Sequence, residues 1–220
     1  MSILSPNQQK ILSLVSEDKQ ITDNFCLSGG TALAEFYLGH RFSEDLDFFS
    51  ENEFDPQAIT AFFASIKKSG DIKTITLEQS FNRNLFFLEL NDNESIKTEF
   101  TYYPFSSIEP GKKLGQLKID SLLDIAVNKI FTIYQKPRSR DFIDLYCILD
   151  QKKEWSVSDL VKKAQIKFDH HIAPLPLSAQ FIKSEILKDY PRMIENLPEK
   201  SWHDFFISQA KFLSQSQLGK

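Results

Sequence analysis

The chain has 220 residues, of which 41% are hydrophobic and 25% charged, with a formal net charge of −4. This balance describes a globular chain with one large or two small domains, and no apolar run approaches the ~20 residues of a membrane span. The polar first ten residues show no signal peptide, and two cysteines are too few for a disulfide framework or a zinc site, so we expect a cytoplasmic protein with no membrane partner.

The first half of the sequence alternates between helix and strand patterns. Apolar residues recur at helical spacing before residue 17, and short apolar runs bounded by turn residues indicate strands. Asp55 and Pro56 are a typical N-cap and first helical residue, and Gly39 is a typical helix stop. We predict helices over 6–17, 31–38 and 55–70, and strands over 25–27, 45–49, 84–90 and 96–103.

The second half is predicted to be helical nearly throughout. Proline residues punctuate its connections, and the change from mixed to helical patterns falls near 105–118. Residues 1–110 carry eight Lys and Arg against 17 Asp and Glu, whereas residues 111–220 carry 18 against 13. The fold class is therefore α+β, with an α/β domain over 1–110 and a helical domain over 111–220. The predicted helices cover 120–135, 139–150, 156–168, 176–189 and 201–214.

Asp45 and Asp47 form the densest functional pattern. On a strand, residues i and i+2 face the same side, so the two carboxylates converge while Leu46 faces the interior. Like charges held together repel unless a cation lies between them, and a hard divalent ion such as Mg²⁺, or Mn²⁺ in its place, takes oxygen ligands. An acidic pair on a solvated edge strand is the competing interpretation.

A glycine pair lies fourteen residues before this acidic pair. Only seven glycines occur in the chain, and Gly29, Gly30 and Gly39 fall within eleven residues. A strand followed by Gly29, Gly30 and Thr31 at a helix start presents backbone N–H groups and a positive helix end to an anion. A glycine pair alone usually makes only a turn. Together with the acidic pair, it predicts a cradle for a triphosphate beside a metal site.

For three further charged residues, Glu99, Lys129 and Asp141, the sequence pattern alone does not decide between a structural and a functional role. Glu99 faces away from the apolar side of its strand and reaches the acidic pair if the two strands are neighbours; a solvent-exposed glutamate explains it equally well. Lys129 lies on an apolar helix stripe, where its ammonium either reaches solvent or binds an anion. Asp141 is explained by its place in a first helical turn, whereas Asp144, on the same face, is not.

These motifs resemble a known family. The run from Gly29 to Ala34, with the run from Leu38 to Phe49, resembles the signature of the AbiEii/AbiGii-type toxins, which belong to the polymerase-beta-like nucleotidyltransferases. Lys129 and the run from Arg140 to Tyr146 match the later motifs of that family. The resemblance implies a polymerase-beta-like mixed sheet followed by helices, and covers residues 27 to 146.

The resemblance implies an enzyme that moves a nucleoside monophosphate from an NTP to an acceptor, such as the end of an RNA like tRNA. It also implies a type IV-like toxin or phage-defence protein with a cognate antitoxin. The roles then expected are a nucleotide site of Gly29, Gly30, Thr31, Arg41, Ser43 and Lys129, a metal site of Asp45, Asp47 and Glu99, and a catalytic set of these three carboxylates with Lys129 and Asp141.

Two other function classes compete with nucleotidyl transfer. One is a catalytically silent module that binds a nucleotide or a partner protein; a carboxylate pair that repels itself argues against it. The other is a metal-dependent nuclease or phosphohydrolase, which needs no triphosphate cradle. Release of pyrophosphate, rather than of monophosphate or cut strands, distinguishes the transferase from both.

Overall fold

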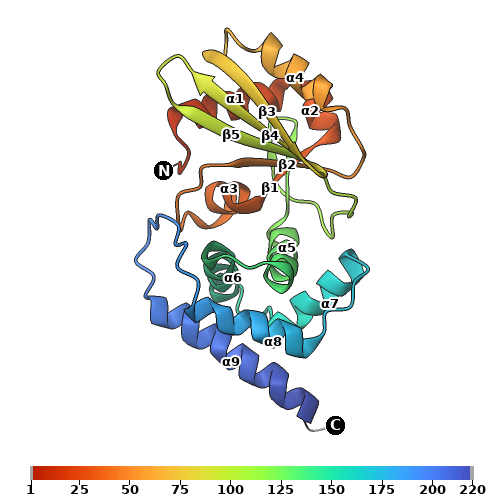
Figure 1. Cartoon of the computed structure of the whole chain (residues 1–220), viewed down its shortest axis with the longest axis vertical. Coiled ribbons are helices and arrows are strands. Elements are labelled where there is room, and N and C mark those ends of the chain that lie inside the picture. The colour runs from red at the N-terminus through yellow and green to blue at the C-terminus, as the bar shows by residue number, and fades with distance from the viewer. Residues whose placement is uncertain (1, 219–220) are drawn as a thin grey trace. The chain divides into compact units, whose positions relative to one another are not determined.

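The computed structural model describes residues 2–218 and contains two compact units, of which the first ends at Ser121 and the second begins at Leu122 (Figure 1). The predicted change at residue 110 falls earlier than this division, because two short strands within 113–119 pair with the sheet of the first unit. Within residues 2–218, no helix combines the length and apolar character needed to cross a membrane.

The first unit is built on a mixed sheet, as the α+β prediction requires. Its order is β3-β4-β5-β2-β1-β7-β6. β2 runs parallel to β5 and antiparallel to β1, while β3, β4 and β5 form an antiparallel meander. The strands are β1 (Cys26–Ser28), β2 (Leu46–Ser50), β3 (Ile72–Ser80), β4 (Arg83–Leu90), β5 (Ser95–Tyr102), β6 (Lys113–Leu114) and β7 (Leu117–Ile119).

Helices α1 (Pro6–Glu17), α2 (Lys19–Asn24) and α4 (Pro56–Ser65) lie on one side of this sheet (Figure 1). Phenylalanine side chains fill the space between α4 and the sheet: Phe63 contacts Phe86 and Phe100, and Phe48 stacks on Phe100 at 4.7 Å between ring centroids. Buried and half-buried residues alternate along β2. The core therefore takes one face of the sheet, and Asp47 projects from the other.

Several elements of this unit differ from the sequence prediction: α2, β6 and β7 were not predicted, and α4 ends at Ser65 and not near residue 70. Two other differences concern β3 and α3. β3 was not predicted, because a register shift between Ile72 and Thr74 breaks its alternation and its outer residues are exposed polar side chains. The predicted helix over 31–38 begins earlier, as α3 (Gly29–Leu33), and continues as a π-helix (Ala34–Leu38). It ends at Gly39, whose φ of 66° is the left-handed stop that the sequence predicted.

The second unit is helical, with α5 packed on α6 and α7, and α8 packed on α9. Its core contains Phe142, Phe181, Trp202 and Phe206, all at most 1% exposed. The helix predicted over 176–189 begins slightly earlier, because α8 starts at Pro174. It also ends earlier, because α8 passes into a 3-10 turn (Lys183–Glu185). The helices are α5 (Leu122–Gln135), α6 (Ser139–Gln151), α7 (Val157–Lys167), α8 (Pro174–Ile182) and α9 (Glu199–Leu218).

Candidate functional site

The glycine pair lies between β1 and α3, where other side chains press against its backbone. Gly29 has a φ of 72°, a left-handed conformation that favours glycine. A Cβ at Gly29 would overlap with the Asp47 carboxylate, and one at Gly30 would overlap with the Arg41 guanidinium. The sequence analysis explained both glycines by a bound phosphate. In the structure, the left-handed backbone and the Asp47 side chain favour glycine at position 29, whereas the Arg41 guanidinium beside Gly30 is the end of a flexible side chain that could move.

Thr31 holds the loop that precedes the acidic pair. Its side chain is fully buried, and its hydroxyl is hydrogen-bonded to Ser43 Oγ at 2.8 Å and to the backbone oxygen of Asp45. Gln8 adds a second tie, because its Nε2 donates to the backbone oxygen of Glu44 at 2.8 Å. The Thr31 hydroxyl is thus used within the protein, where it fixes the loop against α3.

The acidic pair faces the side of the sheet opposite the phenylalanine core. Leu46 is fully buried between Asp45 and Asp47, which are both half-buried, so the alternation predicted from the sequence is present. Asp45 Oδ2 lies 3.0 Å from Lys97 Nζ. The pair therefore has a cation beside it on the neighbouring strand β5.

Glu99 is brought next to the acidic pair, but another residue binds its carboxylate. β2 and β5 pair in a register that sets Asp47 beside Glu99. Arg83 donates from Nε to Oε1 at 2.6 Å and from Nη2 to Oε2 at 2.5 Å, and the Thr101 hydroxyl donates to Oε1 at 2.8 Å. Burial raises the pKa of Glu99, but these hydrogen bonds and the charges of Arg83 and Lys97 lower it below its ordinary value.

Arg83 is a residue of this site that the sequence analysis did not identify. The hydrogen bond to Glu99 raises the pKa of Arg83, and the charges of Glu99, Asp47 and Asp45 add to the rise against the opposing effect of burial. Its side chain is 52% exposed. A lone arginine at the start of a strand gives no sign in the sequence of which carboxylate it will face, because that depends on the register of β4 and β5.

Asp120 is a second residue that the sequence analysis did not identify. It directly follows β7 and is buried, and its Oδ2 accepts a hydrogen bond from Ser28 Oγ at 2.5 Å. Ser28 is the β1 residue directly opposite Asp47. The Tyr37 hydroxyl donates to the backbone oxygen of Asp120 at 2.8 Å. Asp120 thus fixes the end of β1, where the glycine pair begins.

The predicted metal site of three carboxylates is not assembled. Within residues 2–218, no three His, Cys, Asp or Glu side chains come together in a way that could hold a metal ion. Two of the three carboxylates have cations as partners in this structure, because Glu99 pairs with Arg83 and Asp45 with Lys97. Asp45 and Asp47 still fit Mg²⁺ as hard oxygen donors, because Mg²⁺ commonly takes one or two carboxylates and completes its coordination with phosphate oxygens and water.

Lys129, Asp141 and Asp144 form a buried ion cluster in the second unit. Lys129 Nζ lies 2.8 Å from Asp141 Oδ1 and 2.7 Å from Asp144 Oδ2, and the three side chains are 9%, 1% and 0% exposed. The cluster joins α5 to α6. It accounts for Asp144, which the sequence left unexplained, and it gives the Lys129 ammonium two partners inside the protein.

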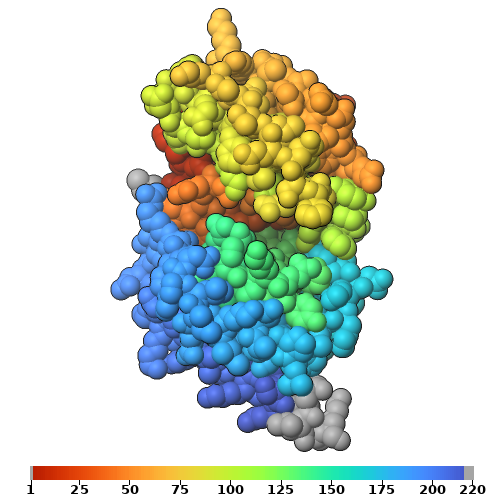
Figure 2. Space-filling model, viewed as in Figure 1, coloured from red at the N-terminus to blue at the C-terminus, as the bar shows by residue number. Residues whose placement is uncertain are grey.

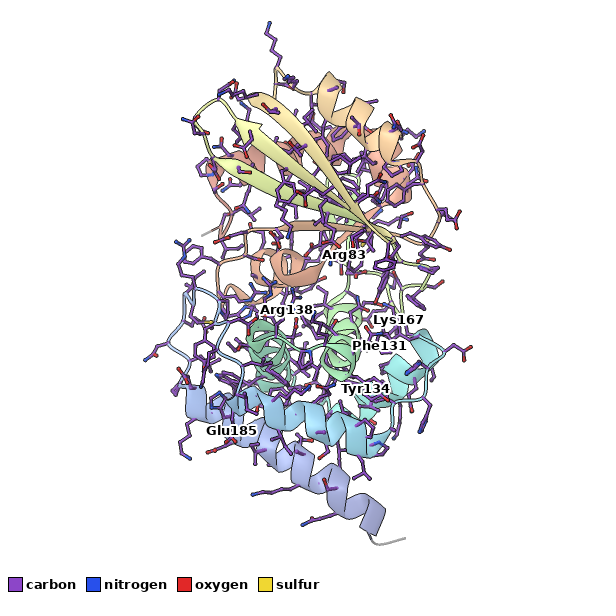
Figure 3. The ribbon with its side chains drawn as sticks, viewed as in Figure 1. Arg83, Phe131, Tyr134, Arg138, Lys167 and Glu185 are labelled. Atoms are coloured by element: carbon purple, nitrogen blue, oxygen red, sulfur yellow. The ribbon has the colours of Figure 1, made fainter. Side chains whose placement is uncertain are left out.

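Arg138, which precedes α6, completes this cluster (Figure 3). Its backbone N–H donates to Asp141 Oδ2 at 3.1 Å, the capping contact expected in a first turn, and its Nε lies 3.3 Å from the same oxygen. Burial raises the pKa of Asp141, but the charges of Lys129 and Arg138 lower it below its ordinary value. Asp141 therefore both caps α6 and pairs with Lys129.

Comparisons with known proteins agree with the motifs. Residues 12–213 match the family described as "Nucleotidyl transferase AbiEii toxin, Type IV TA system". "Uncharacterized protein aq_aa25" of Aquifex aeolicus (strain VF5) is 34% identical over 164 residues, which are 73% of this chain and 71% of that protein.

Two solved structures from Helicobacter pylori share the fold. JHP933 has a TM-score of 0.61 at 17% identity, over 97% of this chain and 94% of its own. A candidate nucleotidyltransferase has the same TM-score and identity, over 97% of each chain. At this identity the likeness shows the fold alone, which is that of nucleotidyltransferase-like proteins.

Proposed function

The chain belongs to the AbiEii family of nucleotidyl transferase toxins, and from that premise we propose that it transfers a nucleoside monophosphate from an NTP to an acceptor hydroxyl. The observation that carries this proposal is the contact between the glycine turn and the acidic pair: the Asp47 carboxylate occupies the space that a Cβ at Gly29 would need. A triphosphate on the turn would therefore lie directly against the carboxylates.

In the proposed reaction, the acceptor hydroxyl gives its proton to water, and its oxygen forms a bond to the α-phosphorus. The bond from the α-phosphorus to the bridging oxygen of the β-phosphate breaks, and pyrophosphate leaves. Asp45 and Asp47 would hold Mg²⁺, or Mn²⁺ in its place, which when bound neutralises phosphate charge and activates the acceptor oxygen. Positioning and electrostatics supply most of the rate in such reactions.

The other residues of the first unit support this arrangement. Thr31 and Ser43 hold the loop before the acidic pair, as their hydrogen bond shows. Arg41 lies against Gly30, is buried, and donates from Nη1 to the backbone oxygen of Phe42. We propose that its guanidinium also attracts the phosphates of the donor. For Lys129 and Asp141 we propose a positioning role, because their charges are matched within a buried cluster.

We further propose that the acceptor is the end of an RNA, such as tRNA, and that a cognate antitoxin protein binds the chain. The excess of Lys and Arg in residues 111–220 supports an anionic acceptor, since phosphate backbones bind clustered cations. The antitoxin rests on the toxin–antitoxin description of the matched family. A cytoplasmic location follows from such substrates.

The experiment incubates the purified chain with Mg²⁺, each labelled NTP and total RNA, and follows both label transfer and pyrophosphate release. We expect RNA labelling with one or more NTPs, dependence on Mg²⁺ or Mn²⁺, and a loss of about 100-fold or more in Asp47→Asn. Asp71→Asn, which removes an exposed carboxylate of the same unit, is the matched control.

Two outcomes would refute the proposal. Shortened RNA without transferred label would identify a nuclease. Saturable NTP binding without pyrophosphate release, at the same level in wild type and Asp47→Asn, would identify a silent binding module.

A further inference from the structure

Beyond the acidic pair, two cations lie on the same face of the sheet. Side chains of registered neighbours on paired strands face the same side, and the pairing sets Asp47 beside Glu99 and Arg83 beside Thr101. The ion pairs of Lys97 with Asp45 and of Arg83 with Glu99 follow from this register. The two cations belong to β5 and β4, whereas the glycine turn follows β1 on the other side of β2.

The carboxylate of Glu99 fixes the guanidinium of Arg83. Both of its oxygens are bound, at 2.6 Å and 2.5 Å, in the fork geometry that holds an arginine most firmly. Glu99 is itself buried, at 7% exposed. These bonds use Nε and Nη2, so the Nη1 donors of the half-exposed side chain are still available to a ligand.

A half-buried apolar surface continues from these cations along β4. Leu85 and Phe87 face the same side as Arg83, and Phe87 is the direct cross-strand neighbour of Lys97. In Figure 2 the side chains of β3 and β4, coloured yellow, lie at the front of the first unit with no helix over them. An aromatic face beside cations is the combination that binds single-stranded nucleic acid.

We propose that this surface binds the acceptor strand, with Arg83 and Lys97 contacting its phosphates and Phe87 stacking against a base. Glu99 is then a positioning residue that holds Arg83, instead of a metal ligand or a general base. The inference rests on the proposed function and adds a direction to it. The donor triphosphate lies on the β1 side of the acidic pair, and a single-stranded RNA end approaches from the β4 and β5 side.

The first test measures binding without catalysis, by fluorescence anisotropy with a labelled single-stranded RNA oligonucleotide and, separately, a fluorescent NTP analogue. Arg83→Gln is expected to weaken RNA binding about tenfold or more and to reduce the slope of log affinity against log salt by about 0.7. NTP affinity is expected to be unchanged. Lys10→Gln, which removes a cation from an exposed ion pair of the same unit, is the matched control and should bind RNA as wild type.

Phe87→Leu separates stacking from charge. It is expected to weaken RNA binding about fivefold or more without changing the salt slope, because a stacked ring neutralises no phosphate. Unchanged RNA affinity in Arg83→Gln, or a loss confined to the NTP analogue, would overturn the proposal. The anisotropy measurements need no turnover. The absence of nucleotide transfer would therefore refute the proposed function, while the RNA-binding surface would still be judged by the anisotropy results.

The second test asks whether Glu99 acts through Arg83. Glu99→Gln should weaken RNA binding as Arg83→Gln does, and adding it to Arg83→Gln should cost no more than about twofold. Arg83→Lys, which keeps the charge but loses the fork, should fall between wild type and Arg83→Gln. A Glu99→Gln protein with normal RNA affinity but a weakened Mg²⁺ dependence of activity would overturn the assignment and make Glu99 a metal ligand.

Discussion

Replacement of Lys129 by methionine should destabilise the helical unit strongly. Its ammonium lies 2.8 Å and 2.7 Å from carboxylate oxygens of Asp141 and Asp144, and none of the three side chains is more than 9% exposed. Methionine preserves most of the packing but leaves two carboxylates buried without their shared cation. Removing one partner of a buried ion pair costs about 3–5 kcal/mol, because the remaining charge is uncompensated. We expect the unfolding free energy to fall by that amount.

The two tryptophans of the chain make this measurement specific. Trp155 and Trp202 both belong to the second unit, so tryptophan fluorescence during urea denaturation reports that unit. Lys162→Met is the matched control, because Lys162 pairs with Asp159 on the surface of α7 and both side chains are more than half exposed. It should unfold at the urea concentration of the wild type.

A further variant tests the reason for the loss. Neutralising both carboxylates together with the lysine, in Lys129→Met/Asp141→Asn/Asp144→Asn, should recover at least half of the stability lost in Lys129→Met, because no uncompensated charge then remains. A loss below about 1 kcal/mol in Lys129→Met, the range of an exposed pair, would refute the buried cluster as described.

Two further predictions concern pH and the glycine turn. Burial raises the pKa of Asp141, but Lys129 and Arg138 lower it below its ordinary value, so the contribution of Asp141 to stability is present above the unfolded pKa of about 3.9 and is lost as the pH falls through the lower folded pKa. Asp141→Asn should therefore make the unfolding free energy fall less steeply at acid pH. An unchanged pH dependence below about pH 4 would contradict this. Gly29 has a φ of 72° and lies against the Asp47 carboxylate, so Gly29→Ala should lower the unfolding free energy by about 1–2 kcal/mol, as measured by circular dichroism. It should also reduce nucleotidyl transfer, as measured by pyrophosphate release. An alanine variant with wild-type stability and activity would show that the turn relaxes freely.

The parts of the site that local sequence determines could be predicted. Asp45 and Asp47 share a face because strand alternation is a property of the backbone, and Leu46 between them is buried as that pattern requires. The glycine turn was predicted because the chain has few glycines and two are adjacent. Its immediate cause was not predicted, since no pattern shows that Asp47 and Arg41 approach that backbone.

The parts that depend on long-range pairing could not be predicted. Arg83 and Glu99 are sixteen residues apart and meet only because β4 and β5 pair antiparallel in one register. A shift of one residue would send Arg83 to the opposite face of the sheet. The cluster of Lys129 with Asp144 likewise depends on how α5 packs against α6, although each residue is on a predicted helix.

The pairing of Lys97 with Asp45 connects the acidic pair to the proposed acceptor surface. Without a divalent ion, the ammonium at 3.0 Å relieves the repulsion between the two carboxylates. On the proposed function, Asp45 would hold a metal ion that supplies this charge when bound, and Lys97 would then be free to pair with the acceptor phosphates. Metal binding and acceptor binding would therefore favour each other by the same factor, because such coupling is reciprocal. On this proposal, the acidic half of the chain would bind an anionic acceptor more tightly when its carboxylates are neutralised both by a metal ion and by Lys97 and Arg83.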